Sequence, residues 1–266
     1  MAGPSWTQRS DRPIVWHAER CVNQDLADRI LELSNATAQA QTPFEGVARI
    51  HQILEQGDPA LVLIRRLLAR RTQLPLANFE PTYVLEYPAG HRCGIGQAMP
   101  HHDWNCPSSG AQEGPRNPND ADPTDGQPGC EYLRLVTSLV YLNTVPAGWG
   151  GATVLPRAGL RADARKGSCF LWFNARRGAG GEIFKEARAQ HLGECVRAPP
   201  NASRAELEAS HVRKYVLVTW IRASRYESAC YEEDPDSCVA ADKLRAAIAE
   251  ESEAEDDDGD GEKVEL

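Results

Sequence analysis

The stretch "RLVTSLVYL" at residues 134–142 has the composition of a β-strand. It is short, rich in β-branched residues, and lies between clusters of Gly, Pro and Asn. Four more segments share these properties: 82–87 (TYVLEY), 152–156 (ATVLP), 168–174 (SCFLWFN) and 214–221 (KYVLVTWI). Several short strands separated by turn residues predict a β-sandwich or barrel. The polar, Pro- and Gly-rich residues 107–129 predict a long loop between two of these strands.

The N-terminal region has a helical pattern instead. Between residues 24 and 72, apolar residues recur at helical spacing in three sets: Leu26, Ile30 and Leu33; Val47, Ile50 and Ile53; and Leu61, Ile64 and Leu68. Asp58 followed by Pro59 is typical of a helix start. The sequence therefore predicts an α+β fold, mostly β with N-terminal helices, in a single domain at residues 24–228. Residues 1–23 are expected to be an N-terminal extension, and residues 229–266 a C-terminal segment.

The net charge is concentrated at the C-terminus. Of the 266 residues, the last seventeen contain ten acidic side chains and one lysine, which account for the whole net charge of −9. The run "EESEAEDDDGDGE" lacks apolar periodicity and is expected to be a disordered, solvated tail. The rest of the chain is formally neutral, which argues against nucleic-acid binding. No stretch approaches the ~20 apolar residues that a membrane span needs.

Several features indicate the secretory pathway. The chain has eight cysteines and glycosylation sequons at Asn35 and Asn201, and it ends in "KVEL", which is similar to retrieval signals of the endoplasmic reticulum. The N-terminus lacks the apolar region of a signal peptide. We therefore expect a protein of the endoplasmic reticulum lumen or the secretory pathway whose leader or anchor is absent from this chain. The alternative is a cytoplasmic protein with free thiols.

The stretch "QAMPHHDWNCP" at residues 97–107 places two histidines close to a carboxylate. On a strand, His101 and Asp103 project to the same side, while His102 points to the opposite side. A third ligand must come from a distant segment, and His191 in "AQHLGECV" precedes the last expected strand. Two histidines and one carboxylate suit non-haem Fe(II). The same set can hold zinc in a hydrolase, so these residues alone leave the reaction open.

Five blocks in order resemble the prolyl 4-hydroxylases, members of the 2-oxoglutarate- and Fe(II)-dependent dioxygenases. They are "PHHDW", "RLVTSLVYLNTVPAGWGGATVLP", "ARKGSCFLWFN", "HLGECV" and "RKYVLVTWI", spread between about Tyr87 and Arg222. The cysteine-flanked insert after the His-x-Asp motif and the C-terminal "VEL" are most similar to the transmembrane type of the endoplasmic reticulum. The resemblance implies a double-stranded β-helix, a jelly roll of eight strands, over residues 80–224, braced by helices at 24–72.

The resemblance also implies an activity and its ligands. His101, Asp103 and His191 would bind iron, and Lys214 would pair with the distal carboxylate of 2-oxoglutarate. The implied reaction hydroxylates peptidyl proline to 4-hydroxyproline with O2 and 2-oxoglutarate, releases succinate and CO2, and uses ascorbate. The domain at 24–228 would then be catalytic.

Four further residues receive roles from the same resemblance. The hydroxyls of Tyr87 and Tyr141 would line the 2-oxoglutarate pocket; the alternative is that both tyrosines only pack in the core. Arg134 and Trp220 would lie near the peptide groove, where an aromatic wall suits a proline-containing chain in the polyproline II conformation. Either of these two residues could instead be structural.

The insert between two of the strands is flanked by cysteines. The likeness to the transmembrane type suggests one disulfide between Cys106 and Cys130, and Cys230 with Cys238 is a second possible pair. The connectivity cannot be read from the sequence. Free thiols are the alternative.

The chain also departs from the family pattern near the groove. Ala98 stands where the family has a tyrosine, Ala152 stands where it has a glutamate, and the connections from Tyr87 to His101 and from His191 to Lys214 are longer than usual. These departures keep open the same chemistry on another side chain or a small molecule. A non-catalytic cupin-like binding module is a separate alternative, against which the complete set of His101, Asp103, His191 and Lys214 argues. A zinc hydrolase would need a general base beside the metal, and no motif supplies one.

Overall fold

The computed structural model describes residues 4–36, 49–53, 56–89, 100–104, 133–179, 181–197, 212–224 and 226. The strands are β1 (Thr7–Asp11), β2 (Ile14–Ala18), β3 (Arg49–Gln52), β4 (Tyr83–Pro88), β5 (Arg134–Tyr141), β6 (Thr153–Leu155), β7 (Leu160–Ala162), β8 (Cys169–Phe173), β9 (Ala175–Arg177), β10 (Ile183–Lys185), β11 (Leu192–Gly193) and β12 (Arg213–Arg222). The helices are α1 (Gln24–Ala36) and α2 (Pro59–Thr72), with short 3-10 turns η1 (Leu76–Asn78), η2 (Pro156–Ala158) and η3 (Ala187–Ala189).

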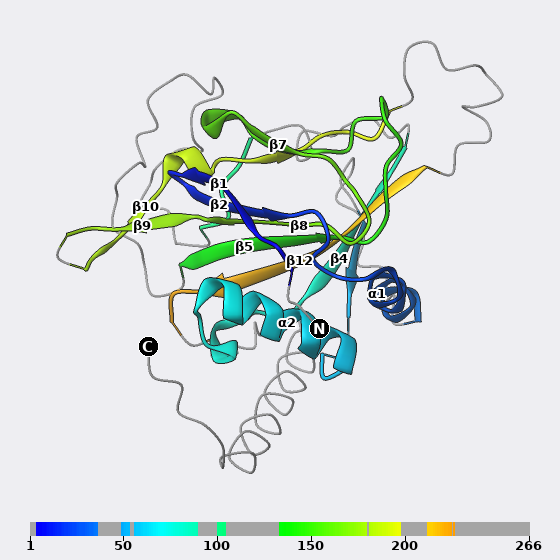
Figure 1. The fold of residues 1–266 in the computed structure, drawn as a ribbon, viewed down its shortest axis with the longest axis horizontal. Coiled ribbons are helices and arrows are strands. Elements are labelled where there is room, and N and C mark those ends of the chain that lie inside the picture. The colour runs from blue at the N-terminus through cyan, green and yellow to red at the C-terminus, as the bar shows by residue number, and fades with distance from the viewer. Residues whose placement is uncertain are drawn as a thin grey trace, which may run out of the picture.

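Two antiparallel sheets form the two layers of the β-fold (Figure 1). The larger sheet has seven strands in the order β1-β2-β8-β5-β12-β4-β3, and the smaller sheet has the order β11-β6-β7. Strands β9 and β10 form a separate pair. The neighbours in the larger sheet are mostly distant in sequence, as in a double-stranded β-helix. The predicted fold, mostly β with N-terminal helices around this core, is confirmed.

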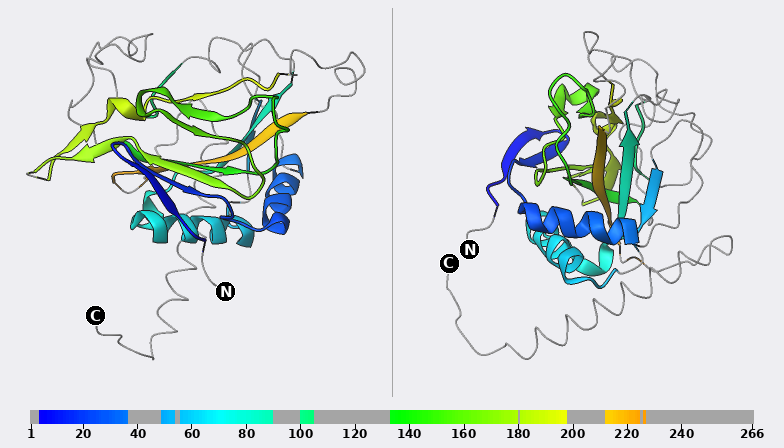
Figure 2. Two further views of the ribbon diagram at one scale, coloured as in Figure 1. Left: turned by 45° about the horizontal axis from the view of Figure 1, so that its top comes forward. Right: turned by 90° about the vertical axis from the view of Figure 1, so that its right-hand side faces the viewer.

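The large sheet is buried on both of its faces at the centre. Its inner face packs against the small sheet through a cluster that includes Tyr141, Phe170, Trp172 and Val216, with Leu155 on the small sheet. Its outer face is covered by α1 and α2, as the two views of Figure 2 show. Strands β5, β8 and β12 are therefore nearly continuous apolar runs without strict alternation, because neither face meets solvent.

The two helices begin and pack as their sequences predict. The Asp58 side chain accepts a hydrogen bond from the Ala60 N–H, and Pro59 occupies the first turn of α2. The apolar faces of both helices are buried in one cluster with the outer face of the sheet, through Ala27, Ile30, Leu33, Leu61, Ile64 and Leu68. In the part of the chain that the structure describes, no helix is long and apolar enough to cross a membrane.

Two parts of the N-terminal region differ from the prediction. Residues 49–52, expected to be helical, form β3 and pair with the edge of β4, because the main-chain hydrogen bonds offered by an unpaired strand outweigh a weak periodicity. The N-terminal extension expected at residues 1–23 contributes β1 and β2 to the large sheet, and β2 pairs with β8. The folded unit therefore begins before residue 24.

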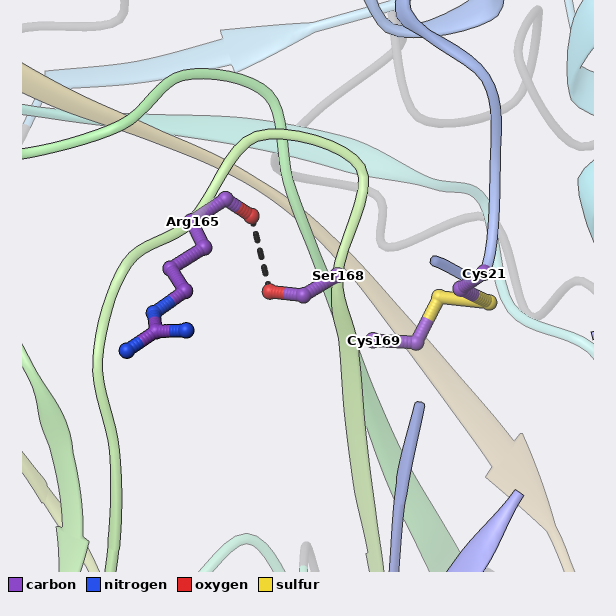
Figure 3. The surroundings of a disulfide bond; sticks show 4 residues. All are labelled: Cys21, Arg165, Ser168 and Cys169. Carbon is purple, nitrogen blue, oxygen red and sulfur yellow. Dashed lines mark hydrogen bonds between the residues drawn. A yellow bond between two sulfur atoms is a disulfide. The ribbon is translucent and has the colours of Figure 1, made fainter. Parts of the chain in front are cut away.

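A disulfide fixes this N-terminal part to the sheet. Cys21, which follows β2, is bonded to Cys169, the first residue of β8 (Figure 3). Ser168 beside it donates a hydrogen bond from its hydroxyl to the Arg165 carbonyl at 2.7 Å. This pairing was absent from the sequence-based expectations. The four cysteines that were expected to pair lie outside the described residues: Cys106, Cys130, Cys230 and Cys238.

Candidate functional site

A main-chain bridge brings His101 and His191 together. The two residues form an isolated antiparallel bridge in which the N–H of each donates to the carbonyl of the other, at 2.9 Å in both directions. Asp103 follows on the same side of the extended chain. One ligand atom from each of these three side chains lies within 4.8 Å of the other two. The Nε2 atom of His191 is 3.4 Å from Asp103 Oδ2, and that of His101 is 3.9 Å from Oδ1.

The surroundings of His191 and Asp103 keep both side chains in the protonation states that suit a metal. The side chains of His191 and Asp103 are only 9% and 11% exposed, whereas that of His101 is 50% exposed. Burial lowers the pKa of His191 to about 3, so its imidazole is neutral at pH 7. Burial acts to raise the pKa of Asp103, but the two histidines and a hydrogen bond from Trp220 lower it to about 2. At neutral pH the pair is a carboxylate beside a neutral imidazole.

His102 lies outside this group of three. Its ring stacks on Trp104 with the ring centroids 4.0 Å apart and an angle of 10° between the planes. The Trp104 indole in turn donates from Nε1 to the Asn174 carbonyl at 2.8 Å. The alternation of side chains along an extended segment therefore separates His102 from Asp103, as the sequence predicts.

Two donors hold the Asp103 carboxylate. Thr137 donates from Oγ1 to Asp103 Oδ2 at 2.8 Å, and Trp220 donates from Nε1 to the same oxygen at 2.9 Å. Thr137 on β5 and Trp220 on β12 are directly opposite each other in the large sheet. The indole N–H of Trp220, a residue expected near a peptide groove, thus contacts a candidate metal ligand.

Arg134 lies on the other side of the Trp220 ring. Its guanidinium is 3.8 Å from the centroid of the indole, which is a cation–π arrangement. It donates from Nε and Nη2 to the two oxygens of Glu80 at 2.9 and 2.8 Å, and Arg222 donates from Nε to one of the same oxygens at 2.8 Å. Glu80 is 4% exposed. A buried carboxylate therefore fixes the guanidinium against the tryptophan that holds Asp103.

A second buried group lies next to the first. Lys214 is opposite Tyr87 in the pairing of β12 with β4, and its amine lies 4.8 Å from the centroid of the Tyr87 ring and 5.6 Å from that of Tyr141. A Cβ atom on Gly193 would lie 3.6 Å from the Tyr87 ring, so this ring borders the segment just after His191. The structure thus gathers all three residues that the sequence analysis assigned to a 2-oxoglutarate pocket.

The Lys214 amine is buried and forms no ion pair with the acidic side chains of the described residues. Burial lowers its pKa to about 7, an effect that Glu194 partly offsets. Glu194 forms its own ion pair with Arg161. Burial also raises the pKa of Tyr87 and of Tyr141, so both phenols remain hydrogen-bond donors at neutral pH. This pocket is chemically suited to an anion.

Sequence reasoning missed several residues of these two groups. Thr137 and Asn174 belong to the hydrogen-bond network around Asp103, and Glu80 holds Arg134. Thr153 is 3% exposed and lies opposite Ala162 in the small sheet, where the Ala162 carbonyl accepts a hydrogen bond from the Tyr141 hydroxyl at 3.4 Å. The signal for both threonines was present, because each lies in a motif that was identified, "RLVT" and "GGAT". Asn174 and Glu80 had no such signal, because their partners are defined only by the strand pairing.

Comparison with known proteins supports a relationship that the motifs indicate. No family model matches the chain. The chain is 28% identical over 183 residues to prolyl 4-hydroxylase subunit alpha-2 of Gallus gallus, a match that covers 65% of this chain and 30% of that relative. The chain therefore spans less than a third of the relative's length.

One of the solved structures compared, a viral enzyme, has the same fold. A viral collagen prolyl hydroxylase of Paramecium bursaria Chlorella virus 1, in its 2OG complex, matches with a TM-score of 0.51 and 17% identity, over 79% of this chain and 96% of that one. A Pseudomonas putida prolyl-4-hydroxylase matches with a TM-score of 0.42 and 14% identity, over 82% and 93%. The chain is thus similar in sequence to a prolyl 4-hydroxylase subunit and has the double-stranded β-helix fold of a viral prolyl hydroxylase.

Proposed function

We propose that this chain is a 2-oxoglutarate- and Fe(II)-dependent dioxygenase that hydroxylates peptidyl proline to 4-hydroxyproline. The observation that carries the proposal is the juxtaposition of two groups: the ligand atoms of His101, Asp103 and His191 within 4.8 Å of one another, and the nearby buried amine of Lys214. The three ligand residues alone would also suit a cupin-like binding module or a zinc hydrolase. Neither of those needs a buried lysine beside the metal.

The three ligand residues fit Fe(II) by their chemistry. Two imidazoles and one carboxylate leave coordination positions free for other ligands. The chemistry supplied at this site when Fe(II) and 2-oxoglutarate are bound is O2-dependent hydroxylation of an unactivated C–H bond, coupled to decarboxylation of 2-oxoglutarate to succinate and CO2. His101, the exposed ligand, lies on the side open to solvent. Ascorbate is the expected reductant that keeps the iron ferrous.

The anion pocket fits 2-oxoglutarate. Lys214 would form an ion pair with the distal carboxylate, and the protonated hydroxyls of Tyr87 and Tyr141 would donate hydrogen bonds to it. Binding of the carboxylate would raise the pKa of Lys214 back towards its ordinary value, because the new negative charge favours the ammonium form. This ion pair would position the co-substrate at the metal.

Arg134 and Trp220 would form the wall where a peptide approaches. The indole is fixed at one edge by Asp103 and on one face by the Arg134 guanidinium, so its orientation is set before a substrate binds. A rigid aromatic surface suits a proline-containing peptide in the polyproline II conformation, which is itself preordered. We infer a single catalytic unit that includes β1 and β2.

The compartment is a further part of the proposal. The disulfide between Cys21 and Cys169 closes a separation of 148 residues, and disulfides of this kind persist in oxidising compartments. Together with the sequons, this supports the lumen of the endoplasmic reticulum or the secretory pathway.

The experiment that tests the function measures succinate formation from 2-oxoglutarate with Fe(II) and ascorbate. Proline-rich, collagen-like and proline-free peptides are compared, and mass spectrometry locates any added oxygen. We expect succinate in proportion to peptide and the oxygen on proline. The matched controls are His191→Ala, which should be inactive, and His102→Ala, which should be active. Hydroxylation of another side chain would redirect the proposal to a different substrate, and no turnover with any peptide would contradict it.

A further inference from the structure

Three inner-face residues form one row across the large sheet. Trp220 of β12 is opposite Thr137 of β5, which is opposite Trp172 of β8. Asn174, directly after β8, joins this row: Trp172 donates from Nε1 to its Oδ1 at 2.9 Å, and its Nδ2 donates to Thr137 Oγ1 at 2.8 Å. Since Thr137 donates to Asp103, one chain of hydrogen bonds runs from Trp172 to that carboxylate.

Trp172 fixes which groups donate and which accept along this series of hydrogen bonds. An indole N–H can only donate, so the Asn174 amide must present its oxygen to Trp172 and its NH2 group to Thr137. The Thr137 oxygen thereby accepts a hydrogen bond, and its single proton is left for Asp103. The exposed fractions of Trp172, Asn174 and Thr137 are 0%, 0% and 1%. Each of these buried hydrogen bonds therefore has a fixed donor and acceptor, and water is excluded from taking the place of either.

We propose that Asn174 is a positioning residue that acts through Thr137 to orient the Asp103 carboxylate, an inference that rests on the metal site of the proposed function. Thr137 and Trp220 both donate to Oδ2, so Oδ1 is the oxygen that remains to bind a metal. Partners that orient a ligating carboxylate commonly change metal affinity when they are lost.

The same end of β8 also supports the other buried ligand. The Trp172 ring packs against the His191 ring, with centroids 4.5 Å apart. Trp172 therefore contacts one ligand by its ring and the other through its N–H, by way of Asn174 and Thr137. The end of β8 therefore contacts His191 directly and reaches Asp103 through two hydrogen-bonded side chains.

The test uses substitutions that keep side-chain shape. Thr137→Val removes the hydroxyl, and Thr137→Ser retains it. Asn174→Asp keeps the size of the side chain but, when ionised, has only acceptors, so it would draw the Thr137 proton away from Asp103. Ser138→Ala is the matched control, because Ser138 is the next residue of β5, is equally buried, and points to the other face of the sheet.

The readout is the dissociation constant for Co(II), measured from its visible absorption spectrum, together with the melting temperature of each variant. We expect Thr137→Val and Asn174→Asp to bind Co(II) ~10- to 100-fold more weakly, and Thr137→Ser and Ser138→Ala to bind like the original chain. A Thr137→Val variant that melts normally and binds Co(II) with unchanged affinity would overturn the inference, even if Asn174→Asp fails to fold. If the original chain binds no Co(II), the proposed function falls, and this inference with it.

Discussion

Burial of Lys214 should destabilise the ligand-free fold, while the proposed function uses the same amine to bind 2-oxoglutarate. Burial lowers the pKa of this amine from 10.5 to about 7, while the unfolded chain keeps the ordinary value. Between these two pH values the folded state binds fewer protons than the unfolded state, so stability rises with pH across this window, and the cost is fully present below pH 7. This difference in pKa lowers the free energy of unfolding by about 4 kcal/mol at pH 7 and by about 2 kcal/mol at pH 9.

We therefore expect Lys214→Met to raise the free energy of unfolding of the ligand-free protein at pH 7 by up to about 4 kcal/mol. The gain over the original chain should be about 2 kcal/mol smaller at pH 9, because the original chain is itself more stable there. Urea denaturation at both pH values measures the two gains. Binding of 2-oxoglutarate, followed by calorimetry, should be lost in the same variant.

The control for this prediction is Lys166→Met. Lys166 forms an ion pair with Asp28 at 2.6 Å near the surface, so its removal should give no gain in stability. If Lys214→Met does not raise the free energy of unfolding, or raises it equally at pH 7 and pH 9, the claim that burial lowers the pKa of Lys214 is refuted.

Three further predictions follow from individual contacts. Cys21→Ser opens a covalent loop with a sequence separation of 148 residues and should cost up to about 5 kcal/mol in urea denaturation; an unchanged midpoint would contradict a stabilising role. His191→Ala should abolish both Co(II) binding and turnover, while His102→Ala keeps both, and the reverse order would show that the wrong histidine was assigned. Trp220→Phe keeps an aromatic ring but removes the N–H that holds Asp103, so calorimetry should detect ~10-fold weaker metal binding; equal affinity would mean that this bond does not orient the carboxylate.

The central strands could be predicted from the sequence because their environment is simple. Strands such as β5 and β12 are buried on both faces, so composition alone distinguishes them. Residues 49–52 were assigned wrongly, because a short apolar spacing fits a helix and an edge strand equally well. Residues 7–18 were placed outside the domain, because only pairing with β8 reveals them as strands of the large sheet.

The residues of the candidate metal site could be predicted from the sequence, but the hydrogen bonds around them could not. Alternation along a strand separates His102 from its two neighbours, and the resemblance supplied the distant His191. The hydrogen-bond chain through Asn174 was not predictable, because it depends on the register between β5 and β8. The partner of Cys21 could not be read either, since any of the other cysteines was a possible partner.

The bridge between His101 and His191 makes the positions of the site residues independent of the lengths of the segments that connect them. The spacing of the two imidazoles is set by a pair of peptide hydrogen bonds, and Lys214 is placed by its pairing with β4. Neither arrangement depends on the length of chain that joins these residues. The connections that follow Tyr87 and His191 can therefore lengthen or shorten without moving the ligands.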